Sequence, residues 1–472
     1  MEKVKITDLE NLHVGSETYM LGLDKTSGKV GLVAASEVDG RRPWFGRRWN
    51  KSEASPVGVA IGDLDLGRTL GSVLGLGGYL VNNDHSRRKL LSTNHRFLGS
   101  GEAADLSGAD GHYQWGWNRP FWYQCYEDDT FFYETISIGG PRPGFWNYYI
   151  PVGSRSCAGW AAMDRTNSVL MSCVNSSAQF RGGKNDASAD DAFNSMLGKP
   201  ATNLPMATFR AAARKNGDLW FANERAMHFI TCALKRIILG TRNIQAAFNA
   251  SLDADGLRQG GTGNGAGTPT SWSGNFGNQP YIPLSAGIEF GDYTGTFDID
   301  IQETSAAKTI SGIPSFFGLK NDYKYLGAIS ENMMLMNNED NSQSMYAPLL
   351  VDGSLMSTSN VDALTLIGTG PSCEAAGWMY PKEHYFKNLA FMPKEVGGSQ
   401  STYYCDGYYN DTAVSGLRGA FLLGFAGDGG IAGSLYLNGS YGGSNTDARL
   451  GAFLCEWAEA FTTEPFWCME NK

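Results

Sequence analysis

The chain lacks the short motifs that mark the commoner enzyme and metal sites. Its six His residues include no HxxxH or HxH pair, so a His-based metal site is not expected. It contains no GxSxG turn for an acyl-transfer serine and no GK[ST] phosphate loop. Glu127, Asp128 and Asp129 could act as glycosidase carboxylates, but adjacent acids between two aromatic strands are typical of a solvated turn. The sequence therefore predicts no enzyme, no cofactor and no metal.

A basic surface and a long apolar run are also missing. The formal net charge is −10 and the pI is about 5.2, which argues against nucleic acid because phosphate binding needs Lys and Arg. The start, MEKVKITDLENLHV, has scattered charges and no apolar stretch, so we expect no secretory signal. The candidate membrane span Val73–Val81 is short and interrupted by glycine. The eight Cys form no CxxC pair and are expected to be mostly buried, reduced thiols of a protein made in a cytoplasm.

Five residue types are missing from a long window near the end of the chain. Gly419–Leu454 holds 36 residues but no Lys, Glu, Gln, Met or Trp. These types make up 73 of the 472 residues, so a window of that length would on average hold between five and six of them. Within Ser415–Leu454, short Gly/Ala elements separate side chains of every size. The pattern indicates a fixed frame that carries interchangeable residues.

Two explanations of the missing types remain open. If AAC codons are randomised at their adenines they become NNC, and NNC encodes every residue type except Lys, Glu, Gln, Met and Trp. The missing set would then record diversification of the gene. Alternatively, a buried Gly-rich β segment is poor in long polar side chains, although this explains the missing Met and Trp less well.

The rest of the sequence divides into three parts. Residues 1–50 form a small β-rich unit, 51–111 a β-rich connector and 112–472 the main domain. In the first unit, the β-like runs Thr18–Leu23 and Val30–Ala34 flank a turn. At its end, RRPWFGRRWN is either a docking patch for an acidic partner or a linker whose aromatic rings pack against the next domain. Eight glycines within residues 256–280 predict a long surface loop.

Two helices are predicted in the main domain, over residues 204–216 and 223–239. The second has Asn223 as N-cap, Gly240 after its last turn and one apolar stripe, so it should pack on a core. His228 falls off that stripe and is expected at the surface. Trp115, Trp117, Trp122, Phe132 and Tyr133 could form a sugar-stacking platform, but such density more often forms a β core. The predicted class is α+β, with two helices and mixed or antiparallel sheets.

Several stretches carry a resemblance to a known family. They are residues 87–118, MDRTNSVL (163–170), the LPxxxFxxAxxxG pattern of 204–217, RGGKNDAS (181–188), NIQAAFNASLDADGLRQGG (243–261), PKEVGGSQSTYY (393–404) and SGLR…AGDGGIAG (415–433). Together they resemble the variable proteins of diversity-generating retroelements from phages and prophages of Bacteroides-type gut bacteria. Those proteins have a C-type-lectin-like fold of the formylglycine-generating-enzyme type.

The resemblance implies a phage tail-fibre protein that binds a receptor on the bacterial surface, protein or glycan, and acts in the virion as a homotrimer. Residues 1–50 would attach it to other tail proteins, and residues 415–455 would form the variable region. The implied frame is Gly416, Leu417, Arg418, Gly424, Ala426, Asp428, Gly429, Ala432 and Gly433. The implied ligand-binding side chains are Phe425, Gly427, Gly430, Ile431, Tyr436, Leu437, Asn438, Ser440, Tyr441, Ser444, Asn445 and Thr446.

The sequence departs from the wider fold family in two respects. The calcium-binding tripeptides EPN, QPD and WND are missing, and Cys455 and Cys468 lack the pattern around the paired Cys of formylglycine-generating enzymes. Neither calcium-dependent sugar binding nor oxidase activity is therefore expected. The alternatives are an enzyme of the same fold, either a glycan depolymerase or an oxidase, and a structural virion component that does not contact a receptor.

Overall fold

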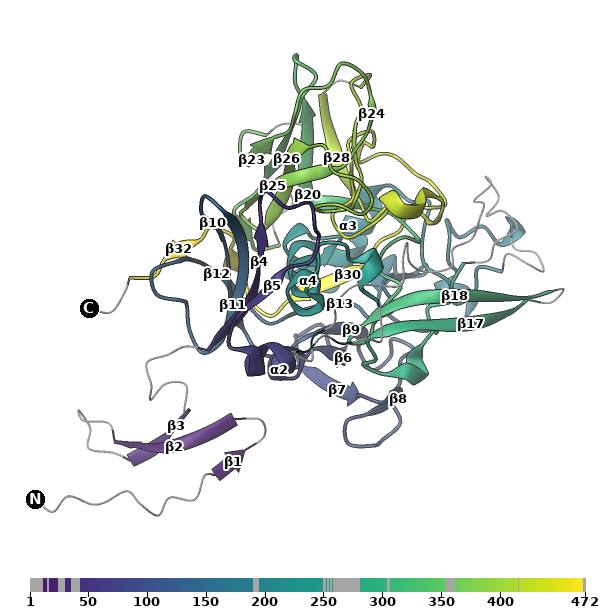
Figure 1. Cartoon of the computed structure of the whole chain (residues 1–472). Helices are drawn as coiled ribbons and strands as arrows, with labels where there is room; N and C mark the ends of the chain where they lie inside the picture. The colour runs from purple at the N-terminus through teal and green to yellow at the C-terminus, as the bar shows by residue number, and fades with distance from the viewer. Residues whose placement is uncertain are drawn as a thin grey trace, which may run out of the picture.

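The computed structural model describes residues 43–189, 195–248, 281–303, 306–353, 361–414 and 416–469, with positions 252, 254 and 257 and the backbone of three N-terminal strands. Within these residues the structure is mainly β-sheet with three α-helices, which confirms the α+β class (Figure 1). The helices are α2 (Leu64–Leu74), α3 (Met206–Arg214) and α4 (Arg225–Leu239). Most of the predicted loop at 256–280, and Ser415, lie outside the described residues.

The N-terminal unit contains a three-stranded antiparallel sheet. Its strands are β1 (Leu12–Val14), β2 (Glu17–Leu23) and β3 (Val30–Ala34), and Leu23 pairs with Val30 at the turn. The predicted hairpin around residues 24–28 is therefore confirmed.

A six-stranded antiparallel sheet begins the main body. In spatial order its strands are β32 (Phe466–Trp467), β12 (Trp146–Ile150), β10 (Phe121–Glu127), β11 (Phe131–Ser137), β4 (Trp44–Asn50) and β5 (Val59–Gly62). Strand β4 ends at residue 50, the predicted boundary, and pairs with β11. Arg47 and Trp49 are buried, and Arg47 Nε donates to the carbonyl of Ile237 at 3.0 Å. Residues 44–50 are thus a core strand, and form neither an exposed docking patch nor a linker.

Two seven-stranded sheets make up most of the rest. The first has the order β16 (Trp220–Ala222), β30 (Leu454–Trp457), β13 (Gly153–Ser156), β9 (His112–Trp117), β6 (Gly77–Val81), β7 (Arg87–Leu91) and β8 (Asn94–Leu98). The second has the order β23 (Thr365–Thr369), β21 (Gln343–Ala347), β20 (Ala328–Asn337), β28 (Gly416–Leu422), β29 (Leu437–Asn438), β27 (Tyr408–Asn410) and β24 (Gly377–Met379). All pairs are antiparallel except β27 with β29.

Smaller sheets complete the body. A three-stranded sheet contains β17 (Gly295–Glu303), β18 (Ala306–Phe316) and β19 (Leu319–Lys320), and its long hairpin projects from the body (Figure 1). The two-stranded sheets are β14 (Ala162–Asp164) with β15 (Val169–Met171), β22 (Leu350–Val351) with β31 (Phe461–Thr462), and β25 (Pro381–Lys387) with β26 (Ala390–Val396).

Helix α4 lies at the centre of the body, where it contacts strands β4, β11, β13, β20 and β26 (Figure 1). It is buried on almost every side, so His228 is 1% exposed and the predicted surface position is wrong. Its N-cap is also not the predicted residue. The Glu224 carboxylate accepts from the amides of Ala226 and Met227, both at 2.8 Å, whereas Asn223 bridges neighbouring strands. The apolar stripe in the sequence predicted the helix and one buried face, but it did not predict that the helix is buried on almost every side.

Helix α2 was not predicted, because glycine usually weakens a helix interior. Two of its glycines, Gly67 and Gly71, face aromatic rings at very short range. A Cβ added at Gly67 would lie 2.4 Å from the ring of Phe45, and one at Gly71 would lie 2.3 Å from that of Phe317. The helix therefore gives up intrinsic stability to allow this close approach. Asp63 caps its first turn by accepting from two backbone amides, both at 3.0 Å.

Candidate functional site

The segment predicted to vary starts and ends inside two different sheets. It leaves strand β28, passes through the 3-10 helix η5 (Ala426–Ile431), forms the short strand β29 and continues as a loop to β30. Both β28 and β30 have a neighbouring strand on each side. The two ends of the segment are therefore fixed by main-chain pairing, which leaves the middle free to form a surface.

Five of the twelve predicted ligand-binding positions are buried: Phe425, Gly430, Tyr436, Leu437 and Asn438. Tyr436 is 1% exposed, and its ring centroid lies 5.2 Å from that of Trp378 and 5.6 Å from that of Phe421. Side chains packed in this way stabilise the fold and do not face a ligand in this structure. A ligand-binding role for the twelve positions stays a prediction, and five of them are core positions in this structure.

The other seven positions are exposed or half-buried. Gly427 and Ile431 belong to η5, and the remaining five lie in one loop, residues 440–446: Ser440, Tyr441, Ser444, Asn445 and Thr446. Within the loop, Tyr441 packs on Phe421 with ring centroids 4.6 Å apart. Ser444, Asn445 and Thr446 are exposed. We call residues 440–446 the presented loop.

Two glycines of the predicted frame, Gly424 and Gly433, differ from the predicted variable position Gly427 in the space around them. Gly424 has a φ of +71°, and a Cβ there would lie 2.6 Å from Cβ of Ala432. A Cβ on Gly433 would lie 1.8 Å from Oδ1 of Asp406. A Cβ on Gly427 would meet nothing within 4 Å. Positions 424 and 433 thus have no room for a Cβ, whereas positions 416, 427 and 429 have; of these three, Gly416 and Gly429 have a positive φ, of +78° and +59°.

The main chain of the presented loop is fixed by hydrogen bonds to the body. Gly419 of β28 donates its amide to the carbonyl of Tyr441 at 3.0 Å, and Met206 at the start of α3 donates to that of Gly443 at 3.1 Å. Inside the loop, Oδ1 of Asn445 accepts from the amide of Gly442 at 2.7 Å. Because Ser444 and Thr446 take no part in these bonds, their side chains can change without loss of the loop conformation.

A groove of about 430 Å³ lies beside the presented loop. The first turns of α3, strands β20 and β28 and the loop itself line it. Its lining residues are Pro205, Met206, Ala207, Arg210, Ile329, Ser330, Met334, Leu417, Arg418, Gly419, Gly442, Gly443 and Ser444. Sequence reasoning identified only the C-terminal part of this set. No local signal marks the rest, because α3 and β20 lie more than a hundred residues before the loop.

A bulge in β20 positions the floor of the groove. Ile329 pairs with Phe421 and Met334 with Gly419, so four residues of β20 lie opposite one residue of β28. Among them, Glu331 accepts from Arg214, lies 3.6 Å from Nε of Arg210 and accepts from the amide of Ala222 at 2.9 Å. Burial raises the pKa of Glu331 to about 7, although Arg214 and Arg210 oppose the rise. These contacts fix α3 against β20 directly beneath the groove.

A second hollow, of about 280 Å³, lies at the far end of the same strand pair. Asn337, Asn338, Asn341 and Asn410 line it, with residues from the turn before β28. Most of these amides already bond to protein atoms. Nδ2 of Asn337 donates to the carbonyl of Asp411 at 2.7 Å, and Nδ2 of Asn410 donates to that of Asn341 at 2.8 Å. This hollow therefore offers fewer free polar groups than its composition suggests.

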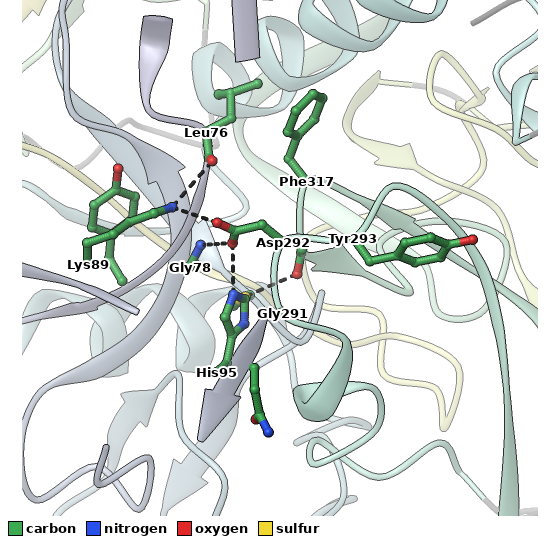
Figure 2. A network of polar contacts seen from close by, with 12 residues as sticks. Leu76, Gly78, Lys89, His95, Gly291, Asp292, Tyr293 and Phe317 are labelled. Atoms are coloured by element: carbon green, nitrogen blue, oxygen red, sulfur yellow. Dashed lines mark hydrogen bonds and ion pairs between the residues drawn. The ribbon is translucent and has the colours of Figure 1, made fainter. Parts of the chain in front are cut away.

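A buried polar cluster elsewhere has some of the geometry of a catalytic triad (Figure 2). Asp292 accepts from Nε2 of His95 at 2.8 Å, from the amide of Gly78 at 2.7 Å and from Lys89 at 3.0 Å. On the other side of the ring, Nδ1 of His95 lies 3.8 Å from Sγ of Cys157. A Cys–His–Asp chain of this kind can activate a thiol nucleophile.

Burial removes that possibility in this structure. The side chains of His95 and Cys157 are fully buried, so no substrate reaches the thiol. Burial raises the pKa of Cys157 and lowers that of His95 to about 4, the latter assisted by nearby Lys320. The thiol is therefore protonated and inaccessible at neutral pH. The cluster instead ties strands β6 to β8 to the turn at Asp292 (Figure 2).

The remaining candidates from the sequence are structural. Glu127 is the last residue of β10, and Asp128 and Asp129 lie in the exposed turn between β10 and β11. Hydrogen bonds from the amide of Phe131 and the hydroxyl of Tyr133 lower the pKa of Asp128. Trp115 and Trp117 are fully buried, as expected for a core. Five of the eight Cys are buried: Cys157, Cys173, Cys232, Cys405 and Cys455.

Two broader searches of the described residues were negative. No group of three or more His, Cys, Asp and Glu in them is arranged to hold a metal ion. None of the helices they form is both long and apolar enough to cross a membrane.

Comparison with known proteins adds no relative. The sequence matches no protein-family model and no curated protein.

Proposed function

We propose that this chain is a receptor-binding protein of a bacteriophage tail, with a C-type-lectin-like body that presents a diversified C-terminal surface to the bacterial cell. The observation that carries the proposal is the presented loop. Its main chain bonds to α3 and β28, while Ser444, Asn445 and Thr446 are exposed beside a groove. A rigid loop with changeable side chains is the arrangement that a binding surface needs, because preorganisation lowers the entropy cost of binding.

The choice of side chains supports the same interpretation. Tyr, Ser, Gly and Asn dominate the presented loop, and these residues combine contact area with adaptable hydrogen bonding at low entropic cost. The frame glycines Gly424 and Gly433 have no space for a Cβ, whereas Gly427 has. The absence of five residue types from Gly419–Leu454 agrees with adenine-directed diversification of the gene; these types are Lys, Glu, Gln, Met and Trp.

The proposal also covers the role of the chain in the phage particle. The N-terminal unit would attach the chain to other tail proteins, and three copies would add avidity to weak single-site contacts. The protein would be made in the host cytoplasm and act in the virion as a binding protein without a cofactor, not as an enzyme. Its partner would be a receptor on the bacterial surface, and neither nucleic acid nor a membrane interior.

Adsorption to cells tests the proposal. Fluorescently labelled chain is incubated with the bacteria that the parent phage infects, and bound protein is measured by flow cytometry. The double variant Ser444→Lys/Thr446→Lys is expected to bind at least about tenfold less, because two long charged side chains block the surface. A matched control, Thr93→Lys/Ser100→Lys, places the same charges at exposed positions around the β7–β8 hairpin and should bind like the unmodified chain.

The outcomes separate the alternatives. Both double variants should unfold within about 1 kcal/mol of the unmodified chain, because exposed substitutions usually change stability by about 0.5 kcal/mol or less each. Equal binding by all three proteins would contradict a role for the presented loop. No binding by the unmodified chain, and no competition with phage adsorption, would favour a structural virion component.

A further inference from the structure

We propose that the groove beside the presented loop binds an acidic peptide segment of the receptor, and that Arg418 recognises its carboxylate. The inference rests on the proposed function, since it names the class of ligand that the same surface would take. Three features carry it: a guanidinium with no acceptor, a lining with no acidic residue, and an apolar floor with no aromatic ring.

Arg418 is the guanidinium that lacks a partner. It is half-buried in β28, where its main chain pairs with β20, but within the part of the chain that the structure describes its side chain makes no hydrogen bond and no ion pair. Its Nε is buried without an acceptor, and its Nη1 lies 3.6 Å from the place that a Cβ on Gly442 would take. The fork of an arginine matches a carboxylate with two parallel bonds, and an unpaired buried donor is costly.

Neighbouring arginines differ from Arg418 in having acceptors. Arg214 bonds to Glu331, and Arg210 donates from Nη2 to the carbonyl of Glu331 at 2.7 Å. Arg449 donates to both carboxylate oxygens of Asp447 at 3.0 Å. Because Glu331 is already held by two arginines and no acidic residue lines the groove, a ligand is the available source of negative charge for Arg418.

The rest of the lining favours a peptide over a sugar. Met206, Ile329, Met334 and Leu417 supply an apolar floor, and no Trp, Tyr or Phe lines the groove. Sugar-binding sites commonly stack a pyranose ring on an aromatic face, whereas flexible methionines adapt to aliphatic side chains of peptides. The hydroxyls of Ser330 and Ser444 supply polar contacts for a peptide backbone. The site therefore fits a carboxylate flanked by aliphatic residues.

The attraction must be local. The chain carries a net charge of −10, so its overall field repels an acidic ligand, but screening limits that field to about 8 Å at physiological salt. Arg418 and Arg210 act within contact distance, inside the groove. We therefore expect single-site binding to be weak and to depend on direct contact with the guanidinium.

Methionine-methyl NMR tests the inference on the full chain. Met206 and Met334 line the groove, so their methyl resonances report its occupancy. The probes are acetyl-Leu-Glu-Leu-Leu-amide, its Gln counterpart and digalacturonate. The Glu peptide is expected to shift both resonances, and the Gln peptide to do so at least about tenfold more weakly, because a charged hydrogen bond is lost.

Two variants complete the test. Arg418→Met keeps an unbranched apolar stem but removes the guanidinium, and should bring the response to the Glu peptide down to that of the Gln peptide. Lys215→Met removes one positive charge from the residue that follows α3, outside the groove, and should leave the response unchanged. Equal responses to both peptides, or no response to either, would overturn the inference. A response to digalacturonate alone would assign the groove to an acidic glycan and overturn the peptide assignment.

Cell adsorption separates this inference from the proposed function. If Arg418→Met chain adsorbs like the unmodified chain while Ser444→Lys/Thr446→Lys does not, the receptor-binding proposal stands and the role of Arg418 falls. If the unmodified chain binds no cells but the Glu peptide still shifts the two methyls, the groove binds acidic peptides and the receptor-binding proposal falls.

Discussion

Helix α4 and the presented loop are held in place by opposite means. Helix α4 is fixed by side-chain hydrogen bonds. Arg236 donates to both carboxylate oxygens of Glu134 at 2.7 and 2.8 Å. Lys235 donates to both carboxylate oxygens of Asp322 at 2.7 and 2.8 Å. In the loop, the bonds to α3 and β28 come from main-chain atoms. Side chains that hold a structure cannot change freely, whereas side chains on a frame held by its backbone can. The molecule thus separates the residues that specify the fold from residues whose side chains are free to change.

Removing one partner of the ion pair in α4 should produce the largest effect. Arg236→Met leaves the carboxylate of Glu134 buried with Tyr123 as its remaining side-chain partner, so we expect a loss of about 3 to 5 kcal/mol in the free energy of unfolding. Burial alone would lower the pKa of Arg236, but Glu134 more than offsets this. Urea unfolding measures the change. The double variant Arg236→Met/Glu134→Gln should recover part of it, and a loss below about 1 kcal/mol in the single variant would contradict the argument.

Acid should weaken the body next, by a smaller amount. Burial lowers the pKa of His95 and of His112 to about 4, that of His228 to about 3 and that of His384 well below its usual range. Their contribution is complete above the unfolded pKa of about 6.5 and is lost as the pH falls towards 4, because the unfolded chain then binds more protons. Burial raises the pKa of Asp406 and of Glu331 to about 7. The folded chain therefore binds protons at these two groups as the pH falls from 7, which increases stability. The net loss from pH 7 to pH 5 should be on the order of 3 kcal/mol.

Urea unfolding at the two pH values checks the sign. NMR titration of the imidazole C–H signals checks the cause, since His95, His112 and His228 should stay neutral at pH 5. Stability that rises on acidification would show that the two carboxyl groups dominate.

The smallest effect is expected within the segment predicted to vary, where a frame position can be compared with a variable position. Gly424→Ala forces a side chain into a left-handed backbone conformation 2.6 Å from Ala432, and should cost about 2 kcal/mol. Gly427→Ala, three residues later, meets open space and should change stability by less than about 0.5 kcal/mol. Thermal unfolding of the two variants compares them directly. Equal losses would mean that the segment has no distinction between frame and variable positions.

The sequence supported the prediction of those features that local chemistry determines. The hairpin at residues 24–28 and the helices α3 and α4 follow from turn and capping residues close to each element. Tertiary features were missed. The burial of His228 depends on strands from distant parts of the chain, and the glycines of α2 make sense only beside Phe45 and Phe317.

The candidate site shows the same limit. The Gly/Ala frame could be recognised in the sequence, because positions without room for a larger side chain are occupied by Gly or Ala. The burial of Tyr436 and Leu437 was not visible, since an aromatic or aliphatic residue between glycines suits a core and a surface equally well. The groove needed the fold, because it joins α3, β20 and β28 from three separate regions of the chain.

The pairing of β28 and β30 has a mechanical consequence. Each strand lies between two others, β28 between β20 and β29, and β30 between β16 and β13. A pull on the presented loop therefore loads two separate sheets at once, through strands that are flanked on both sides. Peeling a terminal or edge strand breaks hydrogen bonds one after another, but extracting an internal strand breaks those on both flanks. If a particle were tethered through this loop, the drag force of the surrounding fluid would act on strands in the interior of this protein's fold.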